Sequence, residues 1–183
     1  MKIDTIFIQN YRCFRELNLS LEEHMTLLVG KNGAGKSTIL DAAAVAASTF
    51  LCGIEGGVNR SIMKEDARYE FYEMNGTVDA QHQFPVMITA KGRCNGDEIG
   101  WIRSLNSAGG KTTVKDARDL IEIAERMQSQ VMAGNMDTVL PVLSYYGTGR
   151  LYAQKKEKRN LQTLRKFNRQ VGYLDCMAAE SNE

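Results

Sequence analysis

The stretch from Leu27 to Leu40, LLVGKNGAGKSTIL, constrains the fold more than any other part of the chain. A short apolar run leads to Gly30, four residues follow, and then come Gly35-Lys36-Ser37 and a helical apolar pattern. This spacing satisfies the phosphate-binding pattern G-x-x-x-x-G-K-[ST]. Glycines let the backbone curl so that several N–H groups point into one concavity, which suits an anion. We therefore predict a phosphate loop between a strand and a helix.

The segments on both sides of the loop fit this interpretation. Residues 25–30, MTLLVG, predict a buried parallel strand, and residues 37–51 predict an alanine-rich helix whose N-terminus adds partial positive charge. We expect Lys36 to reach the β- and γ-phosphates of ATP and the Ser37 hydroxyl to bind Mg²⁺, with Thr38 behind it in the first helical turn. The alternative, an ordinary glycine-rich turn, explains neither the full pattern nor its context.

Composition is that of a globular domain with one core. The chain has 183 residues, of which 43% are hydrophobic and 25% charged, and its formal net charge of +1 gives no sign of a polyanionic partner for the whole chain. No apolar run is long enough to span a membrane, and the N-terminus does not resemble a secretory signal, so we expect a cytoplasmic protein without a membrane partner. Four widely spaced cysteines without a zinc pattern are expected to be reduced.

Apolar alternation predicts two strands before the loop, and β-structure again from Arg68 to Leu105. Asn75-Gly76 and Asn95-Gly96 predict tight turns between antiparallel strands, and Pro85 predicts an edge position or a strand start. Trp101 and the neighbouring tyrosines suit either a base-stacking platform or core packing, and core packing is favoured. The fold class is therefore α/β: a mixed sheet around the helix that follows the loop, with an antiparallel β-subdomain at residues 68–105.

The second half of the chain holds one clear amphipathic pattern and one basic segment. Residues 113–134 predict a helix that ends at Gly134, with an apolar face formed by Leu120, Ile121, Ala124, Met127 and Val131. Residues 137–147 then predict a buried strand. From Arg150 to Gln170 there are eight basic residues and one acidic residue, so this segment carries +7 and the rest of the chain −6. Such a segment suits nucleic acid, an acidic partner or a solvated helical face.

The N-terminal block, from IQNYRCF to the helix after the loop, resembles the start of ABC-type ATPase heads of DNA-repair and chromosome-maintenance proteins. The resemblance rests on Asn10-Tyr11-Arg12 about twenty residues before the loop GKNGAGKST. The later stretch LPVLSYYGTGRL is similar to bacterial AAA-family ATPases of the predicted virulence or anti-phage type, which are often encoded beside nucleases. The resemblance implies a homodimer in the full-length protein, a possible nuclease partner and possible DNA binding.

The resemblance also assigns site residues. It implies that nucleotide is bound by Arg12 at the end of the first strand and by the loop residues Gly30, Lys31, Asn32, Gly33, Ala34, Gly35, Lys36, Ser37 and Thr38. Ser37 is the implied Mg²⁺ ligand. The family places a magnesium-sensing glutamine after the strand that corresponds to residues 140–147, and the nearest glutamine here is Gln154.

Three further elements of the family do not occur after Lys36 in the expected context. They are the signature Leu-Ser-x-Gly, an apolar strand ending in Asp-Glu, and a late histidine. We therefore interpret residues 1–183 as a single domain, the N-terminal lobe of such a head, with the C-terminal half missing. The catalytic residues stay unknown, and we expect ATP hydrolysis of the full-length protein but not of this chain alone. The alternatives are a non-enzymatic nucleotide-binding module with a basic partner-binding segment, and a less well supported small-metabolite kinase.

Overall fold

A four-stranded antiparallel sheet carries the core of the molecule. The computed structural model describes residues 1–74, 77–147, 169, 171–173 and 176–177. In this part of the chain the sheet has the order β2-β1-β5-β6. Its strands are β1 (Lys2–Tyr11), β2 (Phe14–Ser20), β5 (Val86–Cys94) and β6 (Asp97–Leu105). The first strand of the chain therefore pairs with β2 on one side and with β5, about eighty residues later, on the other.

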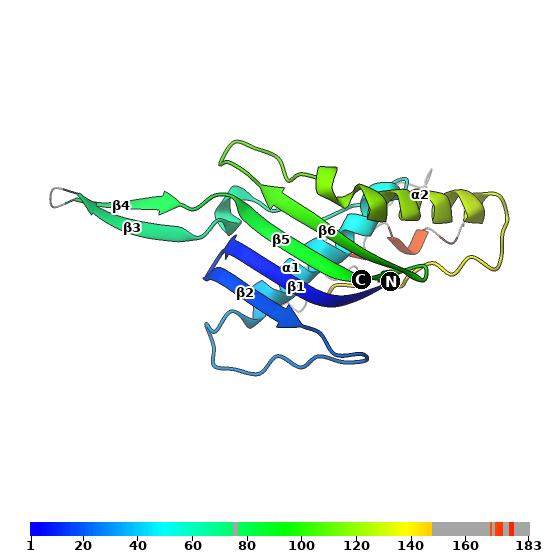
Figure 1. Cartoon of the computed structure of the whole chain (residues 1–183), viewed down its shortest axis with the longest axis horizontal. Coiled ribbons are helices and arrows are strands. Elements are labelled where there is room, and N and C mark those ends of the chain that lie inside the picture. The colour runs from blue at the N-terminus through cyan, green and yellow to red at the C-terminus, as the bar shows by residue number, and fades with distance from the viewer. Residues whose placement is uncertain (75–76, 148–168, 170, 174–175, 178–183) are drawn as a thin grey trace, which may run out of the picture.

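Two α-helices pack against this sheet. The first, α1 (Lys36–Ser48), crosses one face of the sheet and contacts β1, β5 and β6, and α2 (Arg118–Met132) lies beside β6 (Figure 1). A 3-10 helix at Thr49–Gly53 continues α1 and packs against α2. Further 3-10 helices lie at Lys64–Asp66, Lys115–Ala117 and Val171–Tyr173. The result is a sheet with helices on it, which confirms the predicted α/β class. The described sheet is antiparallel throughout, however, and not mixed as predicted.

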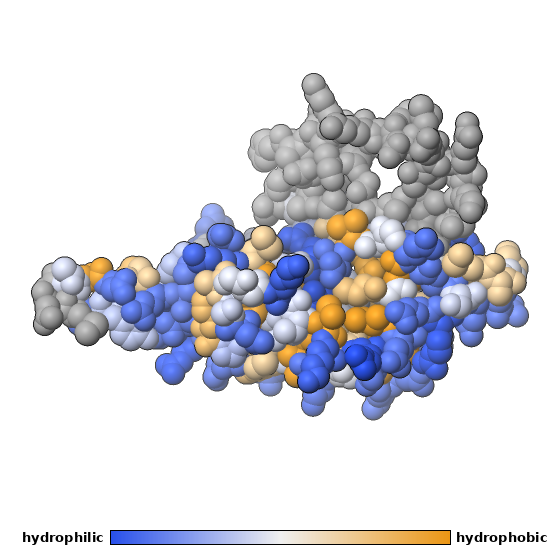
Figure 2. Space-filling model, turned by 90° about the horizontal axis from the view of Figure 1, so that it is seen from above, coloured by the Kyte–Doolittle hydropathy of each residue, from blue (hydrophilic) through white to orange (hydrophobic). Residues whose placement is uncertain are grey.

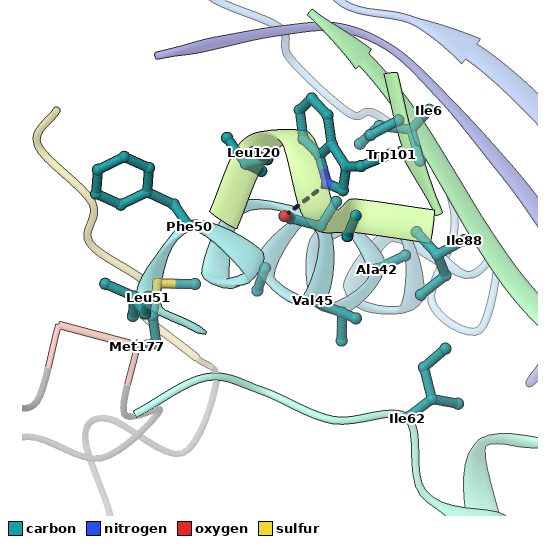
Figure 3. Packing of buried hydrophobic residues seen from close by; sticks show 14 of the residues in the cluster. Ile6, Ala42, Val45, Phe50, Leu51, Ile62, Ile88, Trp101, Leu120 and Met177 are labelled. Atoms are coloured by element: carbon teal, nitrogen blue, oxygen red, sulfur yellow. Dashed lines mark hydrogen bonds between the residues drawn. The ribbon is translucent and has the colours of Figure 1, made fainter. Parts of the chain in front are cut away.

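The core lies between α1, the sheet and α2. Figure 3 shows Ala42 of α1 beside Ile88 of the sheet, and Leu120 of α2 next to the ring of Trp101. Trp101 of β6 is 1% exposed, and its indole Nε1–H donates a hydrogen bond of 3.0 Å to the carbonyl of Ala46 (dashed in Figure 3). The core interpretation of Trp101 is therefore confirmed, because a fully buried indole cannot stack on a base.

Replacing Trp101 by Phe should lower the free energy of unfolding by about 2–3 kcal/mol, since it leaves a void and removes the bond to Ala46. Urea denaturation measures this change. Phe71→Leu is the control, because Phe71 is 74% exposed and its replacement should alter stability by about 0.5 kcal/mol or less. Equal effects of the two substitutions would contradict the packing described for Trp101.

The strands β3 (Tyr69–Met74) and β4 (Thr77–His82) form a hairpin of their own, which projects from the body of the molecule (Figures 1 and 2). Its strands are antiparallel, as predicted, and Tyr69 lies opposite His82. The strands predicted between residues 68 and 105 thus divide between two sheets, since β5 and β6 join β1. The predicted Asn75-Gly76 turn lies outside the described residues.

Several local predictions are confirmed. Asn95 and Gly96, at φ 54° and 93°, form the tight turn between β5 and β6, and Pro85 immediately precedes β5. Both predicted helices form, the first as α1 and its 3-10 extension. Gly134 ends the second with φ 85°, and its N–H donates to the carbonyl of Val131. Val131 itself is only half-buried, whereas Ile123 joins the buried face of α2.

Two predicted buried strands are wrong. Residues 25–30 and 137–147 form neither strand nor helix and belong to neither sheet. Met25, Leu27 and Val29 are 77%, 77% and 84% exposed, and Val142 is 94% exposed. A parallel strand is stable only with paired neighbours and both faces covered, and the described part of the chain offers these segments neither. In the second segment, Leu140, Leu143 and Tyr145 still pack against the core.

Three other expectations concern location and charge. Within the described part of the chain, no helix is long and apolar enough to cross a membrane. Cys13, Cys52, Cys94 and Cys176 form no disulfide bond within the described part of the chain. The basic segment at residues 150–170 lies outside the described residues except for Arg169, whose guanidinium donates to the carbonyl of Thr138.

Candidate nucleotide-binding site

The loop at residues 30–36 curls through two glycines in the left-handed region. Gly33 has φ 83° and Gly35 has φ 86°, values that side chains with a Cβ rarely adopt. The N–H of Ala34 donates to the carbonyl of Lys31, and the N–H of Ile39 donates to the carbonyl of Gly35. The second glycine is thus the residue at which the loop becomes α1. This is the loop-to-helix geometry that the sequence pattern predicts.

Lys36 is folded back over the loop. Its ammonium group donates to the carbonyls of Gly30 and Lys31 at 2.7 and 2.8 Å. A lysine ammonium has three N–H donors, so one is left for another acceptor. These bonds hold the positive charge against the backbone of the loop. The arrangement fits a phosphate group, which needs a cation and several donors converging on one point.

The N-terminus of α1 adds to this. Its N-cap residue is glycine, so no side chain caps the first N–H groups, and the first turn contains no acidic residue. No side chain of α1 therefore occupies these N–H groups or neutralises the helix dipole, and both are available to an anion. Ser37 is exposed and Thr38 is buried behind it, as predicted. An exposed hydroxyl next to a phosphate position suits Mg²⁺, which binds through oxygen ligands and water.

The turn between β1 and β2 lies directly on the loop. A Cβ placed on Gly35 would lie 2.5 Å from the ring of Phe14 and 2.9 Å from the sulfur of Cys13. The Cys13 sulfur also lies 3.9 Å from the Thr38 hydroxyl. Two separate reasons therefore favour glycine at position 35: its left-handed φ, and the lack of space for a side chain. The sequence pattern indicates the first reason, but it does not reveal the contact with residues twenty positions earlier.

Arg12 lies in this same turn, next to Cys13, and adopts φ 49°, which is unusual for a residue other than glycine. Its guanidinium Nε donates to Asp66 at 2.8 Å and Nη1 donates to Asp41 at 2.5 Å. Burial acts to lower the pKa of Arg12. The bonds to Asp66 and Asp41 and the neighbouring Tyr11 outweigh burial, so the pKa is raised above its usual range. Arg12 is therefore a firmly charged group held beside the phosphate loop, rather than a loose surface side chain.

The sequence did not predict the polar cluster around Asp41. This carboxylate, on α1, also accepts bonds from Arg60 at 3.2 Å and from the hydroxyl of Tyr145 at 2.5 Å. The guanidinium of Arg60 lies 4.4 Å from the centre of the Tyr145 ring. Burial and then the bond to Asp41 raise the pKa of Tyr145. Only Asp41 had a local signal, since it follows Ser37 by four residues on one helix and so shares its face.

Neither Glu55 nor Asp66 offers the loop a free carboxylate. Glu55 follows the 3-10 extension of α1, at the end of the helix opposite the loop, and α1 has 13 residues, about 20 Å. Asp66 lies near the loop but is bonded to Arg12. Gln154 lies outside the described residues. Among the residues that the structure describes, no group of three or more metal-binding side chains forms.

This fold and loop agree with the comparison to known families. The model of the AAA domain family matches residues 5–179, nearly the whole chain, so the chain belongs to that family. The match includes the loop, the Arg12 turn and both α-helices. It places the protein among AAA-type ATPases of the kind expected from the N-terminal block.

Curated relatives match shorter stretches. The chain is 40% identical over 42 residues to the DNA double-strand break repair Rad50 ATPase of Methanosarcina acetivorans, and 46% identical over 44 residues to the retron Ec83 probable ATPase of Escherichia coli. It is 30% identical over 79 residues to the DNA replication and repair protein RecF of Chlorobium phaeobacteroides. These matches cover 23%, 23% and 42% of this chain, but only 4%, 8% and 20% of the relatives.

Proposed function

We propose that the chain binds ATP with Mg²⁺ in the loop at residues 30–38. The observation that carries the proposal is the convergence of Lys36 and the uncapped N-terminus of α1 on one curl of backbone. Gly30 to Thr38 would surround the phosphates, with Ser37 as the Mg²⁺ ligand. Bound Mg²⁺ would supply charge neutralisation to the phosphates. The protein's own contribution would be to position them through backbone donors and Lys36.

We further propose that residues 1–183 act as one lobe of a larger ATPase head. The exposed apolar side chains of Met25, Leu27, Val29 and Val142 support this, because such residues are normally covered by neighbouring strands. ATP binding would close two such heads into a homodimer, and hydrolysis would reopen it. Work on DNA is consistent with the names of the Rad50 and RecF relatives. A role in anti-phage defence, in the cytoplasm and with a nuclease partner, is part of the same proposal and rests on the resemblance of the sequence to bacterial ATPases of that type.

A second candidate is a nucleotide-binding module without catalysis. It is favoured by the state of the carboxylates near the loop, since Asp41 and Asp66 are both bonded to arginines. A general base must be free to accept a proton from water, and neither carboxylate is free in that sense. In this case nucleotide would act as a ligand, and the basic segment at residues 150–170 would bind a partner.

The 183-residue chain should not turn over ATP above background. Water attack on the γ-phosphate needs an oriented nucleophile, and the described carboxylates near the loop are engaged elsewhere. The measurement is steady-state phosphate release, with Lys36→Ala as the background. Turnover of about one per second that depends on Lys36 would show that the chain has a water-activating group, because that is an ordinary enzyme rate.

A longer version of the protein that includes the C-terminal half of the head separates the two candidates. Lys36-dependent hydrolysis by that longer protein would support the ATPase head. ATP binding with hydrolysis no faster than Lys36→Ala in the longer protein would favour the non-catalytic module. Absence of ATP binding in both forms would overturn both candidates.

A further inference from the structure

We propose that Asp41 is a positioning residue that, together with Asp66, holds Arg12 as a pre-oriented phosphate-binding group. The proposal rests on the proposed binding of ATP at the loop. It adds a role for two carboxylates that neither the loop pattern nor the family match assigns. In each case the carboxylate acts through Arg12, and so contributes to nucleotide binding without contacting the nucleotide.

Both the side chain and the backbone of Arg12 are held by hydrogen bonds. The Asp66 carboxylate accepts a hydrogen bond of 2.8 Å from the guanidinium Nε of Arg12. The backbone carbonyl of Asp66 accepts a second bond, of 2.6 Å, from the backbone N–H of Arg12. Asp41 accepts Nη1 at 2.5 Å. The Asp41 and Asp66 side chains are only 13% and 11% exposed, so solvent weakens these charge-assisted bonds little. Side chain and backbone of Arg12 are thus held by the same two neighbours.

One part of the guanidinium is left over. Nη2 of Arg12 donates to no acceptor among the described residues, and the side chain is 36% exposed. An arginine held at Nε and Nη1 keeps a fixed plane, so its remaining N–H groups point in one direction. A group held in this way loses little conformational freedom when it binds an anion, which is the usual benefit of pre-organisation.

The residues that hold Arg12 lie close to the loop. Asp41 follows Ser37 by four residues on α1 and therefore lies on the same face of that helix, one turn further along. Cys13, next to Arg12, contacts both Thr38 and Gly35. The backbone of Arg12 is also in the left-handed region, at φ 49°. Strained residues of this kind persist where surrounding contacts over-determine them, and they cluster at ligand clamps.

Two effects of Asp41 on a bound phosphate oppose each other. Its negative charge partly offsets the charge of Arg12, which weakens attraction to an anion. Its bond fixes the guanidinium, which strengthens a directed contact. The second effect should dominate, because Arg60 also donates to Asp41, so two guanidiniums already balance the two carboxylates of the cluster. Asp41→Asn should therefore weaken ATP binding.

The test is a double-mutant cycle in ATP affinity, measured by calorimetry on the 183-residue chain with Mg²⁺. We expect Asp41→Asn and Arg12→Ala each to weaken binding by about tenfold, and the double variant by about tenfold as well, because residues that act as a unit are not additive. Independent losses, about a hundredfold in the double variant, would overturn the proposal. So would wild-type affinity in either single variant.

A matched variant separates positioning from general stability. Asp4→Asn disrupts a remote surface cluster with Lys2 and Arg93 and should keep wild-type affinity. If Asp41→Asn lowers the melting temperature without changing ATP affinity, Asp41 is a purely structural residue and the proposal is wrong. If Asp41→Asn does not fold, Asp66→Asn takes its place in the cycle with the same expected outcomes.

The outcome also distinguishes this proposal from the proposed function. If the folded wild-type chain binds no ATP, both are overturned. If wild type binds ATP, Lys36→Ala does not, and Arg12→Ala binds like wild type, then nucleotide binding stands and only the positioning role is overturned.

Discussion

Lys36→Ala should abolish ATP binding by this chain, with a loss of affinity of at least about 100-fold, while the fold stays intact. The ammonium is held over the loop by the carbonyls of Gly30 and Lys31. Charge-assisted bonds to phosphate contribute about 1.5–3 kcal/mol each, and more than one N–H would be lost. A fluorescent ATP analogue gives the affinity directly.

The matched control for this substitution is Lys115→Ala, which removes an exposed lysine in a 3-10 helix before α2. It should leave affinity unchanged, since charges separated by more than about 10 Å are largely screened at ordinary ionic strength. A loss of binding in both variants would indicate a general electrostatic effect. Full binding by Lys36→Ala would mean that the loop does not hold the phosphates.

Gly35→Ala should remove ATP binding almost as completely as Lys36→Ala and should also lower the melting temperature. The left-handed φ of 86° costs about 1–2 kcal/mol for a residue with a Cβ. In addition, the new Cβ would lie 2.5 Å from the Phe14 ring and 2.9 Å from the Cys13 sulfur. The loop and the β1–β2 turn must therefore move apart, which displaces the start of α1.

Gly33→Ala provides the comparison, because Gly33 has nearly the same φ, 83°, but open space around its Cβ position. It should weaken ATP binding by only about tenfold, the equivalent of its conformational cost. A second variant tests the clash itself: Phe14→Ala combined with Gly35→Ala should recover part of the melting temperature. Equal effects of the two glycine substitutions would show that the contact with Phe14 does not matter.

The loop and both helices could be predicted because their signals are local. Gly30, Gly35 and Lys36 have fixed spacing, and Leu120, Ala124 and Met127 repeat at helical intervals, so the residues that determine these elements are close in sequence. The Asn95-Gly96 turn is local in the same way, because two residues with positive φ are sufficient to reverse the chain.

The errors arise where partners are distant. Residues 25–30 have the composition of a buried strand, but a strand forms only when a neighbour pairs with it, and none does in the described part of the chain. The same holds for residues 137–147. Composition reports how apolar a segment is, and it does not report whether another segment covers it. The side chains of Leu27 and Val142 therefore remain exposed.

The cluster around Asp41 could not be predicted for a related reason. Its members are far apart in the sequence: Arg12 and Asp41 differ by 29 positions, and Asp41 and Tyr145 by 104. Their approach depends on α1 crossing the sheet beside the β1–β2 turn (Figure 1), which is a property of the whole fold. Arg12 was identified from its family context, but its two carboxylate partners become visible only when the chain is folded.

The most direct test of nucleotide binding is calorimetric titration of the wild-type chain with ATP, in the presence and in the absence of Mg²⁺. We predict one binding site, tighter with Mg²⁺ because the Ser37 hydroxyl is free to act as a ligand. The Lys36→Ala variant should show no heat of binding when it is titrated with ATP under the same conditions. A folded wild-type chain that binds no ATP at millimolar concentration would contradict the account, because the loop, the uncapped helix and Lys36 would then hold no phosphate.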